Sequence, residues 1–276
     1  MSQESGINKR LWLFFLLAYA FSWLFWIPQA LAANGVAIPA GVSAFLASPF
    51  NPAAFGPLVA ALLLTLFDEG WKGAINLLKR GLDLRFNKIW LPVILLLPPL
   101  IFTGAIVLSV LTGATALDSS VLSNPIVAIV APVVILLTAG PLQEEFGWRG
   151  YALPRLQRRF NALVSSLILG VLWWLWHLPL VLIPDKFMVS SLSLFGALLV
   201  EMVLVTILFT WIYNNTGGSI LATMLFHTAM NWSIWVVLPN MKVNLPIIGF
   251  TTMLLALVAA GVLSLWGPKR LSHTNG

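Results

Sequence analysis

The sequence predicts an all-α protein, built as a polytopic transmembrane helical bundle. Two observations lead to this fold class. Hydrophobic residues make up 59% of the 276-residue chain, only 9% of its residues are charged, and the mean hydropathy is +0.94. Apolar runs close to the length that a helix needs to cross a bilayer also recur along the whole chain. Because little sequence remains between these runs, we expect a single transmembrane domain over residues 1–276.

The apolar runs predict about eight transmembrane helices in chain order. They cover residues 11–33, 51–67, 90–112, 125–146, 162–183, 192–213, 219–238 and 246–266. With the amino terminus in the cytoplasm, 13 Lys and Arg residues fall in inside segments, and only Lys186 and Lys242 fall outside. This distribution follows the positive-inside rule, so we expect both termini to be cytoplasmic.

The first run also admits a second interpretation, a cleaved signal peptide. Basic residues precede it, and Ala30-Leu31-Ala32 resembles a cleavage site of small residues. However, the run is longer than the roughly 7 to 15 apolar residues of a signal peptide. Trp12, Trp23 and Trp26 also suit an anchor at the membrane interface. We therefore expect a retained membrane helix.

The composition excludes several classes of function. The chain contains no Cys, which excludes disulfides, thiol nucleophiles and thiolate metal ligands. The net charge of +6 does not indicate nucleic-acid binding, because the basic residues lie in short loops beside apolar runs. We expect a multi-pass protein of the cell membrane, whose first partner is the lipid bilayer.

Ionisable side chains within the apolar runs are the candidates for function, since each costs about 2.5 to 3.5 kcal/mol at the centre of a membrane helix. Glu144 precedes Phe160 by 16 residues and His177 follows Asn161 by 16, so both lie about 24 Å from that basic turn. Counting from the turn at residues 214–218 places Glu201 and His227 about 18 Å from that turn. We therefore expect one layer that contains Glu144, Glu145, His177, Glu201 and His227.

Helical spacing divides this layer into pairs, because residues four apart share one face of a helix. Glu145 is expected to pair with Arg149, and His227 with Asn231. Glu144 then points about 100° away from its neighbour, toward water or substrate.

A helix break is predicted just before the two glutamates. Gly140 and Pro141 interrupt the run, and Pro is favoured at the first position of a new helix. Glu144 would then lie in or next to the first turn, where the helix dipole favours an ionised carboxylate. Burial in the bilayer acts in the opposite direction and favours the neutral form. A carboxylate held between these two influences suits a general base.

Three ordered motifs resemble those of the CAAX protease and bacteriocin-processing family (CPBP or Abi, CAAX prenyl protease 2-like). Residues 144–149 read EEFGWR and match the motif EExxxR, His177 falls in FxxxH, and residues 227–231 match HxxxN. The resemblance covers about residues 125–240. Trp173 stands where the family has Phe, a change expected to affect packing rather than chemistry.

The resemblance implies an intramembrane endopeptidase acting on prenylated or membrane-associated peptides, with a site open to the cytoplasmic side. Without a Ser or Cys nucleophile in view, the residues favour attack by water. Glu144 is the expected general base, with His177 helping to hold the water. The expected oxyanion donors are His227 and Asn231, while Glu145 and Arg149 hold the helix and tune Glu144.

Other functions remain open at this stage. A zinc protease would use Glu144, His177 and His227 as ligands. No HExxH motif is present, so we expect no metal or other cofactor. A polytopic carrier would also place carboxylates and histidines at the midplane, but no internal repeat is evident. A non-catalytic immunity or scaffold protein is a further alternative.

Overall fold

The computed structural model describes residues 2–48, 51–114, 125–184, 186–189, 191–235 and 244–273. No strand occurs in these ranges, so the predicted all-α class is confirmed. The α-helices are α1 (Ser2–Ala33), α2 (Ala40–Ala47), α3 (Gly56–Arg80), α4 (Leu91–Leu111), α5 (Pro125–Thr138), α6 (Pro141–Gly147), α7 (Leu153–Gln157), α8 (Ala162–Trp176), α9 (Leu192–Asn215), α10 (Ile220–Trp235) and α11 (Leu245–Trp266). Short 3-10 or π segments are η1 (Ala53–Phe55), η2 (Lys88–Trp90), η4 (Trp148–Ala152) and η5 (Leu178–Leu182).

The number of membrane-spanning segments is smaller than predicted. Among the described residues, six helical segments are long and apolar enough to cross a bilayer, and a seventh results if α5 and the chain over residues 141–157 count as one bent span. The predicted count of eight is therefore not confirmed. The difference arises at α10, which has 16 described residues where a span needs about 20. Residues 236–238 of the predicted segment lie outside the described ranges.

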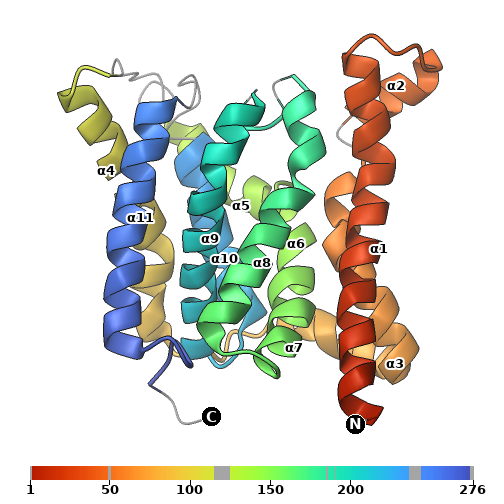
Figure 1. The fold of residues 1–276 in the computed structure, drawn as a ribbon, viewed down its shortest axis with the longest axis vertical. Coiled ribbons are helices and arrows are strands. Elements are labelled where there is room, and N and C mark those ends of the chain that lie inside the picture. The colour runs from red at the N-terminus through yellow and green to blue at the C-terminus, as the bar shows by residue number, and fades with distance from the viewer. Residues whose placement is uncertain are drawn as a thin grey trace.

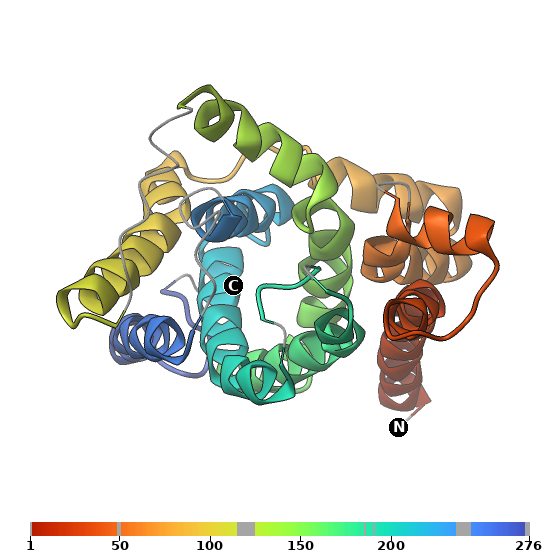
Figure 2. The same cartoon turned by 90° about the horizontal axis from the view of Figure 1, so that it is seen from above.

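The helices are arranged around a central group of α6, α8, α9 and α10 (Figure 2). Helices α1 and α3 pack together on one side of this group, and α4 and α11 pack together on the other (Figure 1). The contacts of α6 with α3 and α10 join the amino-terminal pair to the centre. The segment that carries the two glutamates is therefore enclosed by helices from both halves of the chain.

The contact between α6 and α3 depends on a glycine next to the glutamates. A Cβ atom on Gly147 would lie 2.4 Å from Cβ of Pro57 and 2.5 Å from its carbonyl oxygen. Only the absence of a side chain allows the two backbones to approach this closely. The approach keeps α6 directly against α3.

Helix α1 is part of the core of the bundle. Trp26 is buried and its ring centroid lies 4.6 Å from that of Trp176 in α8. Trp23 donates a hydrogen bond from Nε1 to the Trp176 carbonyl at 3.0 Å. The ring of Trp26 is thus covered by α8, whereas Trp12 is 60% exposed. The aromatic residues tie the first helix to the helix that carries His177.

The basic segments gather at one end of the bundle. Helix α1 begins and α11 ends at this end (Figure 1). Asn214 donates to the Arg270 carbonyl at 2.7 Å and Gln157 donates to Asn214 Oδ1 at 3.1 Å, which joins the turns after α7, α9 and α11. Arg80, at the end of α3, donates to the Gly218 carbonyl at 3.3 Å. Segments that the charge pattern assigned to one side of the membrane thus share one end.

Candidate active site

The site begins at the break between α5 and α6. Gly140 has φ 106° and ψ −54°, a conformation that residues with a Cβ atom rarely adopt. Pro141 takes the first helical position, as predicted, and Gln143 Oε1 accepts a hydrogen bond from the Gly140 amide at 2.6 Å. The chain bends by 42° at this break. Glu144 consequently lies in the first turn of a new helix inside an apolar segment.

The two carboxylate oxygens of Glu144 have different surroundings. Oε2 accepts hydrogen bonds from Trp173 Nε1 at 2.6 Å and from Trp148 Nε1 at 3.2 Å. Oε1 faces the same small space as Nε2 of His227, because a Cβ atom on Gly140 would lie 2.7 Å from the first and 3.2 Å from the second. Within the described residues, no hydrogen bond is formed to Oε1. One oxygen is held by the protein and the other is turned toward His227.

Glu145 forms the predicted ion pair with Arg149. The distance from Arg149 Nη1 to Glu145 Oε1 is 2.8 Å, and both side chains are fully buried. The guanidinium lies 4.4 Å from the ring centroid of Trp173 and 3.7 Å from that of Phe209. The same Glu145 oxygen lies 2.8 Å from Nδ1 of His227. Glu145 therefore joins the arginine to a histidine of another helix.

His227 and Asn231 share one face of α10 but take different partners. His227 reaches Glu145, whereas Asn231 Nδ2 donates to the Ala139 carbonyl at 2.7 Å. That carbonyl lies between α5 and α6, where the regular helical bonding pattern stops. The predicted pairing within α10 is wrong, because each side chain forms its hydrogen bond with a neighbouring segment instead. Asn231 instead stabilises the break that precedes Glu144.

His177 caps the carboxyl end of α8. Its Nδ1 lies 2.8 Å from the Trp173 carbonyl oxygen, which can only accept a hydrogen bond. Nδ1 therefore carries a proton, and in the neutral ring Nε2 presents a lone pair. The ring of Trp173 lies next to His177 and also next to His227, with centroid distances of 5.9 and 5.5 Å. One tryptophan thus contacts both histidines and Glu144.

Glu201 does not join this cluster. It accepts a hydrogen bond from Thr252 Oγ1 of α11 at 3.3 Å. It borders a small space that is also lined by Ile234 and Ile248, away from the other carboxylates. A shared depth is therefore not enough to bring Glu201 to the site, because helical rise gives the depth of a residue but not the direction in which it points.

Comparison with known proteins connects this cluster to a family. The model of the Rce1-like type II CAAX prenyl endopeptidases matches residues 125–233, which include all three motifs. The resemblance to the CAAX protease family is confirmed. The chain is also 24% identical over 225 residues to CAAX prenyl protease 2 of Methanococcus maripaludis. The matched region covers 79% of this chain and 82% of that protein. The family is a family of proteases.

The chain departs from the CAAX protease motif at Trp173, and the expected effect on packing alone is wrong. The indole N–H of Trp173 donates to Glu144, which the phenyl ring of the family's Phe is unable to do. The departure therefore changes the hydrogen bonding of the expected general base.

The zinc alternative is not supported by this geometry. Within the described part of the chain, no group of three or more His, Asp or Glu side chains is placed to hold a metal ion. The reaction proposed below uses these residues without a metal.

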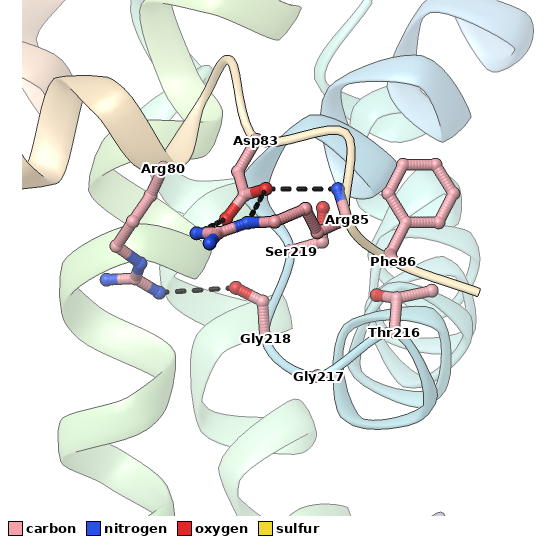
Figure 3. A pocket seen from close by; sticks show the side chains of 8 residues that line it. All are labelled: Arg80, Asp83, Arg85, Phe86, Thr216, Gly217, Gly218 and Ser219. Atoms are coloured by element: carbon pink, nitrogen blue, oxygen red, sulfur yellow. Dashed lines mark hydrogen bonds and ion pairs between the residues drawn. The ribbon is translucent and has the colours of Figure 1, made fainter. Parts of the chain in front are cut away.

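A separate cavity of about 190 Å³ lies at the basic end of the bundle (Figure 3). Its lining consists of Arg80, Asp83, Arg85, Phe86, Thr216, Gly217, Gly218 and Ser219. The Arg85 guanidinium lies 2.7 Å from the Asp83 carboxylate and lowers the pKa of that carboxyl to about 2. None of the motif residues lines this cavity, so it is distinct from the candidate active site.

Sequence reasoning missed the residues that orient Glu144. Trp148 follows Glu144 by four residues, so helical spacing gave a signal for this contact. Gln143 follows Gly140 by three residues, the spacing of a capping box. Trp173 gave no comparable signal, because its contact with Glu144 joins two helices.

Proposed function

We propose that this protein is a CPBP-type intramembrane endopeptidase in which Glu144 activates water for hydrolysis of a peptide bond. The observation that carries the proposal is the asymmetry of the Glu144 carboxylate. Trp173 and Trp148 hold Oε2, and Oε1 faces the space next to Nε2 of His227. A carboxylate with one fixed and one available oxygen suits a general base.

In the proposed reaction, Glu144 Oε1 removes a proton from water as the water oxygen bonds to the peptide carbonyl carbon. The carbonyl π electrons move to its oxygen and form a tetrahedral oxyanion. Glu144 then gives the proton to the amide nitrogen as the C–N bond breaks and the carbonyl forms again. The lone pair on Nε2 of His177 accepts a hydrogen bond from the second O–H group of the water, which keeps that hydrogen, and so helps to orient the water.

To donate a hydrogen bond to the oxyanion, His227 needs a particular protonation state. Its Nδ1 donates to Glu145, so Nε2 becomes a donor only when the ring carries both protons. In the proposal His227 is an imidazolium, stabilised by the buried Glu145 carboxylate, and Nε2–H donates to the oxyanion. One amide hydrogen of Asn231 is used by Ala139, and the second is assigned to the same oxyanion.

The proposed substrates are prenylated or membrane-associated peptides of CAAX type. This assignment rests on the family match and on the relative from Methanococcus maripaludis, whose name describes a CAAX prenyl protease. We place the basic end of the bundle in the cytoplasm of a cell-membrane protein, following the positive-inside rule. Reporter fusions after residue 276 test this: a cytoplasmic reporter is expected to be active and a reporter that needs export to be inactive.

The decisive experiment compares two glutamates of the helical bundle in purified protein reconstituted in liposomes. Glu144→Gln is expected to lower the rate of cleavage of a prenylated CAAX peptide by about 100-fold to 10,000-fold, the usual contribution of a general base. Glu201→Gln is the matched control, because Glu201 is a carboxyl of the same bundle outside the cluster. Undiminished cleavage by Glu144→Gln would refute the proposal.

The same preparation separates the alternatives. Loss of activity with a chelator and recovery only with zinc would establish the metal mechanism in place of the metal-free one. Solute flux without peptide cleavage would favour a carrier, and neither activity would favour a non-catalytic immunity or scaffold protein.

A further inference from the structure

The clearest unexplained feature of the cluster is the double hydrogen bond to Oε2 of Glu144. Two indole N–H groups, from η4 and from α8, converge on this one oxygen at 3.2 and 2.6 Å. Hydrogen bonds to an ionised acceptor are the strong ones, and the 2.6 Å contact with Trp173 is the shorter of the two. Trp173 is 1% exposed, so water does not compete for this donor.

We propose that Trp173 is a positioning residue for the reaction, which holds the Glu144 carboxylate so that only Oε1 meets the water. The inference rests on the proposed role of Glu144 as general base and concerns the position at which the chain departs from the FxxxH motif. A carboxylate can rotate about its last side-chain bond, and that rotation exchanges Oε1 and Oε2. The donor from α8 fixes this rotation.

The contacts of Trp173 separate its N–H from its ring. The ring packs against Phe209 at a centroid distance of 5.6 Å and against the guanidinium of Arg149 at 4.4 Å. A Phe at this position, as in the family motif, offers an aromatic face for these contacts but no hydrogen bond to Glu144. The replacement Trp173→Phe therefore removes the donor and preserves the aromatic character of the core.

The expected consequence is a loss of turnover rather than of substrate binding. Trp173 donates to Oε2 of Glu144, whereas the proposed position of the water and substrate lies on the Oε1 side. A hydrogen bond to a charged group contributes about 1.5 to 3 kcal/mol, so kcat is expected to fall by about tenfold to about 100-fold. KM is expected to stay within about twofold, because an unfixed base removes stabilisation of the transition state alone.

The kinetic test compares Trp173→Phe with Trp211→Phe. Trp211 is a buried tryptophan of α9 whose Nε1 has no hydrogen-bond partner within the described residues, so the control loses the same ring volume without losing a bond. Trp148→Phe, which removes the longer of the two bonds, is expected to have an intermediate effect. Equal kcat values for Trp173→Phe and Trp211→Phe, or a loss confined to KM, would overturn the proposal.

A second measurement does not depend on activity. In NMR spectra of protein labelled with ¹⁵N at its 13 tryptophan indoles, the Trp173 signal is expected to move upfield in Glu144→Gln, because the acceptor loses its charge. The Trp211 signal is expected to stay in place. The two tryptophan-to-phenylalanine variants assign these signals.

The two measurements distinguish the possible failures. If Glu144→Gln continues to cleave peptide, the proposed function fails whatever the spectra show. If the Trp173 signal does not respond to Glu144→Gln, the positioning role fails even where the same variant has lost all activity.

Discussion

Replacing Gly140 by Ala tests whether the space between Glu144 and His227 is where the chemistry occurs. The new Cβ atom would lie 2.7 Å from Glu144 Oε1 and 3.2 Å from His227 Nε2. An ordinary contact begins at 3.4 Å, so the carboxylate oxygen would have to move by at least 0.7 Å, the difference between 3.4 and 2.7 Å. The methyl group would also occupy the space assigned to water.

This replacement has two expected effects, one on the stability of the protein and one on the reaction rate. The φ of 106° disfavours any residue with a Cβ atom, and a strained backbone of this kind costs about 1 to 3 kcal/mol of stability. Displacement of a reacting group by about 1 Å costs about 100-fold in rate. We therefore expect kcat/KM to fall by about 100-fold or more, together with a modest loss of thermal stability.

The matched control is Gly35→Ala, which introduces a Cβ atom at a positive φ but no close contact. Gly35 has φ 89°, and a Cβ atom there would meet nothing within 4 Å. Both variants are assayed for peptide cleavage in liposomes and for thermal unfolding in detergent. Gly140→Ala is expected to lose activity far beyond Gly35→Ala at a similar loss of stability. Comparable activity in the two variants would show that the space beside Gly140 is not used in the reaction.

Three further predictions concern the ion pairs and the close helix contact. Arg149→Met removes one partner of the fully buried pair with Glu145, so the free energy of unfolding in detergent is expected to fall by about 3 to 5 kcal/mol. Arg10→Met, which breaks a partly exposed pair with Asp68, is expected to cost at most about 1 kcal/mol in the same assay; equal losses would contradict the role of burial. Gly147→Ala is expected to lower the melting temperature strongly, because its Cβ would meet the Pro57 backbone, and an unchanged melting temperature would refute that contact.

Local sequence signals predicted the parts of the site that lie on one segment. The break before Pro141 followed from Gly and Pro, and the pair Glu145–Arg149 followed from a spacing of four residues. Both features depend on backbone geometry that a few neighbouring residues determine. For the same reason, hydropathy predicted the helical class, since the length of an apolar run is also a local property.

Features that depend on two helices were not predictable in this way. Depth counting placed Glu201 level with the site, but α9 turns it toward Thr252 of α11. Spacing placed Asn231 beside His227, but the free carbonyl at Ala139 determines where its amide goes. Trp173 was read as a packing residue because its partner lies 29 positions away on another segment. The rotation of each helix about its axis decides these contacts, and it follows from the packing of the whole bundle.

The different roles proposed for Glu144 and Glu145 have an electrostatic explanation that involves the whole buried cluster. In the proposed resting state, two carboxylates face one guanidinium and the imidazolium of His227, so the buried cluster carries no net charge. When Glu144 takes the proton of water, its negative charge moves to the oxyanion beside Nε2 of His227. The step relocates a charge within a low-dielectric site and creates none, which avoids the large cost of an unbalanced ion at bilayer depth. In this proposal, Glu145 keeps the cluster balanced with Arg149 and His227 while Glu144 changes its protonation state.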